Sequence, residues 1–204
     1  MSEETGVLRV LQLKGRPAER DIAAATGVRG EALRQILRSM TAGEWCVEEQ
    51  GRFRLTPAGR DRLDRQLAVE RERVDRSGIV AAYGRFVEHN AVVKRIFTDW
   101  QLIDDTTVND HGDADYDAQV IERLAGLHEA ARVDLAAIVG LAPRLAPYPH
   151  RLAHALAKVR GNERAWLTSP LVDSYHTIWF ELHEELLGLT GLARADEALA
   201  GRAE

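Results

Sequence analysis

Residues 30–41 carry two faces of opposite chemistry at helical spacing. The apolar face repeats at i, i+3, i+4 and i+7 and consists of Leu33, Ile36, Leu37 and Met40. The opposite face has the same spacing and consists of Glu31, Arg34, Gln35 and Arg38. The apolar face would hold a helix to its domain. The polar face carries side chains that can pair with base edges, Arg with guanine and Gln with adenine. An ordinary solvated helix face has a similar composition, so the neighbouring segments decide between the two interpretations.

Two shorter helices are expected before this stretch. Apolar periodicity predicts one helix over 7–14 and another over 19–26. Gly27 then tolerates a positive φ, and the apolar side chain of Val28 can fill the gap between two helices. This pattern predicts a helix-turn-helix over 19–41.

A compact β-hairpin is expected after it. Residues 45–50 and 52–55 read as two short strands with a tight turn between them. Arg52 lies at the turn, where it could touch a phosphate or enter a minor groove. Glu48 and Glu49 would repel phosphates if they faced DNA.

Two motifs carry a resemblance to a known family. They are the turn region at residues 21–28, DIAAATGV, and the stretch after the hairpin at 55–60, LTPAGR. In the second motif Thr56 can cap a helix that begins at Pro57 and continues to about residue 76. With these motifs, residues 5–75 resemble the winged helix-turn-helix domains of MarR-like and PadR-like bacterial transcriptional regulators. The resemblance implies binding to double-stranded DNA, with the helix 30–41 in the major groove. The DNA-binding residues that it implies are Arg29, Glu31, Arg34, Gln35, Arg38, Arg52 and Arg54.

From residue 77 onward the pattern is entirely helical. Ser169 with Pro170 is expected to start the last helix, and a Pro-rich linker is expected over 143–149. The chain is therefore predicted to be mainly α, with a winged helix-turn-helix domain over 1–76 and an all-α helical bundle over 77–204. The apolar stripes of the bundle predict helices over about 79–100, 113–138, 152–159 and 170–189.

Aromatic side chains of the bundle have two interpretations. Trp100, Tyr175 and Trp179, together with His183, could line an effector pocket. Aromatic residues at helical spacing more often form a packed core. The core interpretation is favoured, and the effector pocket stays a hypothesis.

Two groups of residues have spacings that suggest a metal site. His150 and His154 stand at i, i+4, a spacing that can chelate an ion, but no complete ligand motif accompanies them. The alternating aspartates at 113, 115 and 117 resemble the start of a calcium loop, but Ala118 stands where that loop needs glycine. An acidic helix N-terminus explains these aspartates better. No metal or cofactor is predicted.

Nucleophilic chemistry has little support in the sequence. Cys46 lies on a predicted strand, and no second cysteine exists to resolve an oxidised form. No Ser-His-Asp arrangement, glycine-rich phosphate loop or paired-carboxylate motif is evident. The chain is not expected to be an enzyme.

Charge is distributed unevenly along the chain. Residues 1–76 contain 15 Lys and Arg against 13 Asp and Glu, while the rest contains 12 against 19, within a total of −5. A phosphate-binding function would therefore belong to the N-terminal part. The acidic start of the chain lacks the features of a signal peptide, and with one cysteine it suggests a cytoplasmic protein.

Together these features predict a homodimeric transcriptional regulator that binds double-stranded DNA through its N-terminal domain. The helical bundle would dimerise, in keeping with the two-fold symmetry of operators, and could sense a small molecule. Two alternatives remain open. One is a winged helix used for protein–protein contact, and the other is a metal- or ligand-binding helical protein with a winged-helix appendage.

Overall fold

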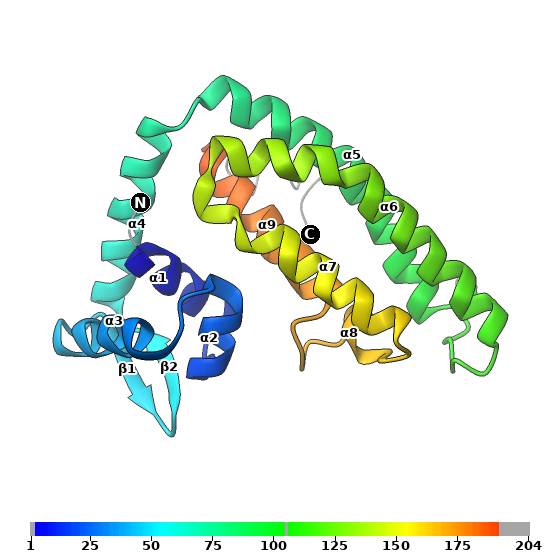
Figure 1. The fold of residues 1–204 in the computed structure, drawn as a ribbon, viewed down its shortest axis with the longest axis horizontal. Helices are drawn as coiled ribbons and strands as arrows, with labels where there is room; N and C mark the ends of the chain where they lie inside the picture. The colour runs from blue at the N-terminus through cyan, green and yellow to red at the C-terminus, as the bar shows by residue number, and fades with distance from the viewer. Residues whose placement is uncertain (1–2, 105, 192–204) are drawn as a thin grey trace. The chain divides into compact units, whose positions relative to one another are not determined.

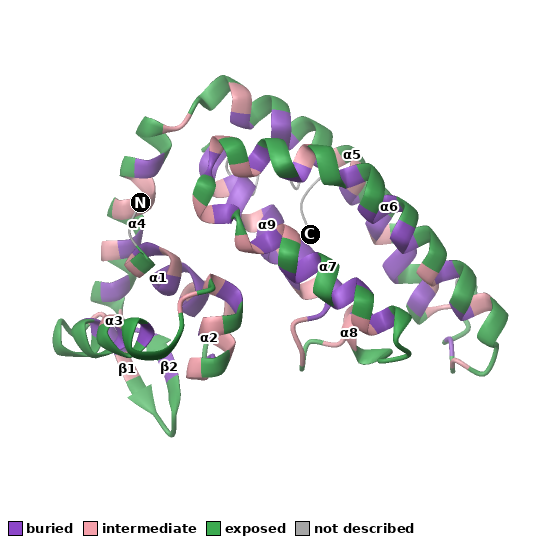
Figure 2. Cartoon of the chain, in the orientation of Figure 1, coloured by how far each residue is buried: buried purple, intermediate pink, exposed green. Residues whose placement is uncertain are grey.

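The computed structural model describes residues 3–104 and 106–191 of the chain. The described part is mainly helical and contains a two-stranded antiparallel sheet. The chain divides into two compact units, Met1–Val74 and Asp75–Glu204, which Figure 1 draws as ribbons. Each unit buries its own apolar residues, and Figure 2 shows the buried residues of both units in purple.

The first unit follows the predicted order of helices and strands. The two strands pair with Cys46 opposite Leu55 and Glu49 opposite Arg52. The predicted bounds agree with the structure to within a few residues, apart from the first helix, which begins earlier. The elements are α1 (Glu3–Lys14), α2 (Glu19–Thr26), α3 (Gly30–Ala42), β1 (Cys46–Glu49), β2 (Arg52–Leu55) and α4 (Pro57–Arg73).

Local chemistry explains where these elements begin and end. Gly27 closes α2 at a φ of 77°, a conformation that glycine adopts at little cost. The Thr56 hydroxyl accepts a hydrogen bond from the Gly59 N–H at 3.0 Å and donates one to the Glu44 carbonyl at 2.6 Å. A Cβ on Gly59 would lie 1.9 Å from the Trp45 carbonyl oxygen. The first turn of α4 is thereby held against the connection between α3 and β1.

The core of the first unit is built mainly from α1, α3 and the hairpin. On α3, Leu33, Leu37 and Met40 are buried and Ile36 is half-buried, so the predicted apolar stripe is confirmed. Buried residues from the other elements complete this core: Val7, Leu8, Val10, Leu11, Ile22, Ala25, Cys46, Phe53, Leu55 and Leu63.

The second unit is helical throughout its described residues. The α5 helix packs along α6 and α9, and α7 packs against α6 and α9. Most of α9 is buried, so this helix is central to the second unit. The elements are α5 (Arg76–Gln101), α6 (Ala114–Leu141), the short 3₁₀ helix η1 (Pro143–Leu145), α7 (Pro147–Arg160), α8 (Ala165–Thr168) and α9 (Tyr175–Thr190).

Two sequence-based expectations for this unit are wrong. The last helix starts at Tyr175 and is capped by Ser174 rather than Ser169, and Leu171, which lies inside the predicted helix 170–189, is 91% exposed. Both serines satisfy the same capping rule, but the Ser169 hydroxyl accepts from the Leu171 N–H in a turn. The predicted linker at 143–149 is largely helical, because proline is well tolerated in the first turn of a helix.

Candidate functional site

The outer face of α3 is open to solvent. Its four predicted DNA-binding residues, Glu31, Arg34, Gln35 and Arg38, are all exposed, and Figure 2 shows the outer side of α3 in green. The opposite side of the same helix supplies the buried stripe of the core. The helix is therefore held by one face while the other offers amide, carboxylate and guanidinium groups.

The charged groups of this face pair with one another. Glu31 accepts a hydrogen bond from Nε of Arg34 at 3.1 Å and another from Nη2 of Arg38 at 2.5 Å. Nη1 of Arg34 also lies 3.8 Å from a carboxylate oxygen of Glu19 on α2. The hydrogen bonds from Arg38 and Arg34 hold the pKa of Glu31 below its usual value. The spacing of Glu31, Arg34 and Arg38 allows these contacts within one helix, whereas the contribution of Glu19 depends on how α2 packs beside α3.

The predicted hairpin residues lie on its outer face. Arg52 and Arg54 alternate along β2 with the buried Phe53 and Leu55, so they point away from the core. Glu49 bridges two arginines, with contacts of 2.6 Å to Arg16 and 3.2 Å to Arg54.

Arg52 and Arg29 have different surroundings from the paired arginines. Nη1 of Arg52 donates to the backbone carbonyl of Arg16 at 3.0 Å. Arg29 is exposed at the N-cap of α3 and forms no ion pair with the residues that the structure describes. Neither of these arginines forms an ion pair with a described carboxylate, although Glu49 stands opposite Arg52 in the strand register.

A groove of about 560 Å³ separates α3 from the hairpin. Leu37 and Phe53 contribute apolar surface, and Glu48 stands opposite Phe53 in the strand register. Glu48 therefore faces the groove and not the outer side of the hairpin, where it would meet Arg52 and Arg54. The lining residues are Glu19, Arg34, Leu37, Arg38, Thr41, Ala42, Glu48, Gly51 and Phe53.

The residues of the predicted effector pocket are part of the core of the second unit. Tyr175 stacks on Trp179 with ring centroids 6.1 Å apart, and the indole N–H of Trp179 donates to Asn90 at 3.0 Å. Nε2 of His183 lies 3.1 Å from the Tyr83 hydroxyl. The cavity that Trp179 and His183 line measures about 10 Å³, room for about one water molecule.

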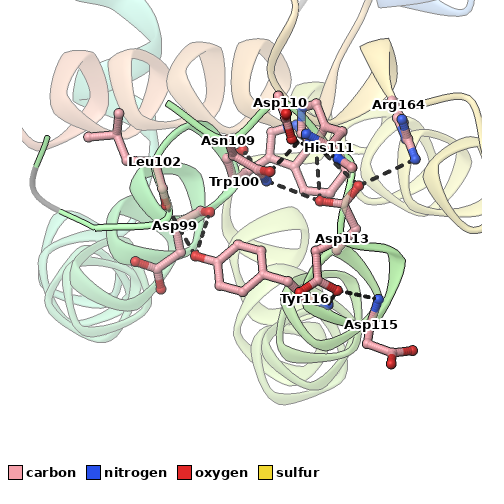
Figure 3. A network of polar contacts seen from close by, with 12 residues as sticks. Asp99, Trp100, Leu102, Asn109, Asp110, His111, Asp113, Asp115, Tyr116 and Arg164 are labelled. Atoms are coloured by element: carbon pink, nitrogen blue, oxygen red, sulfur yellow. Dashed lines mark hydrogen bonds and ion pairs between the residues drawn. The ribbon is translucent and has the colours of Figure 1, made fainter. Parts of the chain in front are cut away.

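Trp100 belongs to a different part of this unit, at the loop between α5 and α6. Its ring lies 4.5 Å from that of His111 (Figure 3). Nδ1 of His111 contacts the buried carboxylate of Asp117 at 2.9 Å, and the Asn109 amide donates to the same oxygen at 3.0 Å. Burial raises the pKa of Asp117, but hydrogen bonds from His111 and Asn109 outweigh it and leave the pKa below its usual value. These contacts hold the loop against the start of α6.

Two of the three aspartates that suggested a calcium loop, Asp113 and Asp117, have structural roles. Asp113 caps α6 by accepting hydrogen bonds from the N–H groups of Asp115 and Tyr116, both at 3.0 Å. The prediction of an acidic helix N-terminus is therefore confirmed. His150 and His154 are exposed on α7. Within residues 3–104 and 106–191, no three His, Cys, Asp or Glu side chains form a group that could hold a metal ion.

The sequence did not predict the buried ion pairs that join η1 and α7 to α9 and to the segment just before it. Arg151 contacts Asp173 at 2.7 Å and Glu181 at 2.6 Å, and Arg144 makes two hydrogen bonds to Glu185 at 2.7 and 2.8 Å. Burial disfavours the charge of Arg151, but these acidic partners raise its pKa above the usual value. The sequence signal for a buried ion pair was Arg151, a charged residue directly beside Leu152 of the apolar stripe of α7.

Cys46 is buried in the core of the first unit, 1% exposed. Its Sγ lies 3.5 Å from the Thr41 hydroxyl, and burial raises the pKa of its thiol. A raised thiol pKa lowers the thiolate fraction, and therefore the reactivity of the side chain, at neutral pH.

No protein-family model, curated protein or solved structure matches the chain. Among the described helices, none has the length and apolar character needed to cross a bilayer.

Proposed function

We propose that this chain is a DNA-binding transcriptional regulator whose first unit is a winged helix-turn-helix domain. In this proposal α2 and α3 form the helix-turn-helix, and the β1–β2 hairpin is the wing. The observation that carries it is the division of α3 into a buried face and an exposed face. The exposed face presents Arg34, Gln35 and Arg38, which are side chains suited to base edges.

Each group would have a distinct part in recognition. With α3 in the major groove, Arg34 and Arg38 would pair with guanine and Gln35 with adenine. Arg29 at the helix N-terminus and Arg52 beside the hairpin turn would contact phosphates, because both are exposed and neither forms an ion pair with a described carboxylate. Phosphate contacts set the register on the duplex, and base contacts supply the specificity.

The second unit would join two chains into a homodimer. An exposed line on α6 consists of small or apolar residues at heptad-like spacing and would allow close approach of a second copy: Gly126, Ala130, Val133, Ala137 and Gly140. A two-fold dimer would match two operator half-sites. A small-molecule effector stays a prediction, and an effector that used the cavity beside Trp179 and His183 would need α9 to shift, because the cavity holds about one water molecule.

The proposal is tested by DNA binding of the purified chain. A duplex library with a randomised centre is enriched on the protein, and the selected duplex is titrated by fluorescence anisotropy over a range of salt. The Arg34→Ala/Arg38→Ala variant is expected to bind the selected duplex at least about 30-fold more weakly, because each base contact contributes roughly 1–3 kcal/mol. The matched control is Arg65→Ala/Arg73→Ala, which removes the same charge from exposed positions on α4.

The outcomes separate the proposal from its main alternative. Equal losses in the two double variants would mean that only net charge matters, and α3 would not be the recognition helix. If no duplex is enriched even at low salt, the protein-contact interpretation takes precedence. The ion pairs of Glu31 and Glu49 favour that alternative, because they reduce the positive field of the face.

A further inference from the structure

The arginines of the proposed recognition helix are already paired with a carboxylate of their own helix. Glu31 contacts Nε of Arg34 and Nη2 of Arg38 through different oxygens. The exposed fractions of these side chains are 66% for Glu31, 49% for Arg34 and 63% for Arg38. The pairs therefore lie on the solvent side of α3, where a duplex would meet both arginines together with their counter-charge.

We propose that Glu31 is a specificity-determining residue of this site. It acts as an intramolecular counter-ion that weakens binding to DNA of arbitrary sequence more than binding to the preferred sequence. The inference rests on the proposed function, and it concerns how the same face distinguishes one duplex from another.

Binding to arbitrary DNA depends on phosphates. A guanidinium that pairs with a phosphate releases ions condensed on the duplex, and this release supplies essentially all of the non-specific affinity. To pair with a phosphate, Arg34 and Arg38 must either break their ion pairs with Glu31 or bring its carboxylate into the negative field of the DNA backbone. Both routes reduce the favourable free energy of pairing with a phosphate.

Base recognition is affected less, because enough donors remain. A guanidinium has five N–H groups, and Arg34 gives only its Nε–H to Glu31. Its Nη1 is 3.8 Å from Glu19, beyond hydrogen-bond distance, so the terminal N–H groups remain for O6 and N7 of guanine. Guanine is neutral, so Arg34 can contact it without leaving Glu31. The pairing also restricts the guanidinium before binding, which lowers the entropy lost on recognition.

The hairpin repeats this arrangement independently. Glu49 lies between Arg16 and Arg54 and contacts one with each oxygen, at 2.6 and 3.2 Å. A carboxylate that bridges two arginines therefore occurs on α3 and again on the hairpin. Both bridges offset positive charge on the part of the first unit that would face the phosphate backbone of DNA.

The test compares Glu31→Gln with the wild type and with Glu72→Gln. The control makes the same change in net charge at an exposed position of α4. Each protein is titrated by fluorescence anisotropy against the selected duplex and against a duplex of scrambled sequence, from low to high salt. Thermal unfolding followed by circular dichroism checks that the variants are folded.

We expect Glu31→Gln to bind the scrambled duplex about fivefold more tightly at low salt, the order of one ion pair in water. Its plot of log K against log salt should steepen by roughly 0.9 for every additional phosphate that the variant neutralises. Affinity for the selected duplex should rise less, so the ratio of selected to scrambled affinity falls. Glu72→Gln should resemble the wild type in ratio and slope.

Two results would overturn the inference while the proposed function stands. In the first, Glu31→Gln behaves like Glu72→Gln on the scrambled duplex. In the second, Glu31→Gln loses affinity for the selected duplex alone, which would make Glu31 a base-contacting residue. If neither the wild type nor any variant binds DNA at low salt, the proposed function fails and the inference fails with it.

Discussion

Arg151 is a charged side chain that lies almost entirely inside the second unit, 7% exposed. Its guanidinium contacts two carboxylates from different segments, Asp173 before α9 and Glu181 within it. Removing one member of a buried ion pair leaves the other charge desolvated and unpaired, a penalty of roughly 3–5 kcal/mol. Most of the stability lost on replacing this arginine would therefore come from the buried carboxylates left without a counter-charge, and less from the lost attraction itself.

We accordingly expect Arg151→Met to lower the free energy of unfolding of the second unit by about 3 kcal/mol. Urea denaturation followed by tryptophan emission measures the change, since Trp100, Trp166 and Trp179 all belong to this unit. Arg132→Met is the control, because the Arg132 side chain is 73% exposed and its pair with Glu129 is solvated. Equal effects of the two changes would show that the buried cluster adds no stability.

At the scale of elements, the approach of α4 to the α3–β1 connection depends on a glycine. A Cβ on Gly59 would lie 1.9 Å from the Trp45 carbonyl oxygen, and backbone atoms on both sides must shift to relieve that contact. Gly59→Ala is therefore expected to destabilise the first unit by about 2 kcal/mol or more. Scanning calorimetry of the full chain would report the loss as a lower unfolding temperature of that unit.

Gly6 supplies the matched control within the same unit. It lies in α1, and a Cβ there would come no closer than 4.0 Å to Thr26. Gly6→Ala should stabilise the first unit by roughly 0.5–1 kcal/mol, since alanine is the better helix former. If Gly59→Ala were also neutral or stabilising, the close approach at Trp45 would not constrain the fold.

The sequence predicted elements well where a local rule had a single solution. Thr56 followed by Pro57 left one place for α4 to begin, and the stripe Leu33, Leu37 and Met40 gave the buried side of α3. It failed where two residues met the same rule, as at Ser169 and Ser174, because tertiary packing chose between them.

At the candidate site, the sequence identified the exposed residues but not most of their contacts. Arg34 and Arg38 were recognised from their spacing, and the structure places them on the groove. The approach of Glu19 to Arg34, and of Glu49 to Arg16, joins residues on separate elements. No periodicity within one helix encodes such contacts. For the same reason, the sequence did not predict the ion pair between Arg144 and Glu185, which are 41 positions apart.

For the whole molecule, the proposed dimer gives the most direct prediction. Val133 is 74% exposed at the middle of the small-residue line on α6. Val133→Arg would place a charge in a helix–helix contact that leaves no room for it. Sedimentation equilibrium should then show monomers at concentrations where the wild type is dimeric.

Val108 supplies the comparison, because it is 70% exposed on the loop between α5 and α6. Val108→Arg makes the same chemical change and should leave the dimer intact. A wild type that remains monomeric throughout the concentration range would refute this dimer outright. Dissociation by both variants would place the interface elsewhere or show that it is sensitive to charge in general.

The central position of α9 also affects the order in which the chain can fold during its synthesis. The aromatic contacts of Phe86 with Trp179 and of Tyr83 with His183 join α5 to the last described helix. The core of the first unit, by contrast, ends at Leu63, with the partly buried Leu67 packed against it. A ribosome that has made α5 to α8 therefore carries one unit with a complete core and another in which the apolar surface that packs against α9 is still uncovered. Nascent chains stalled before α9 should consequently engage chaperones through their second unit alone.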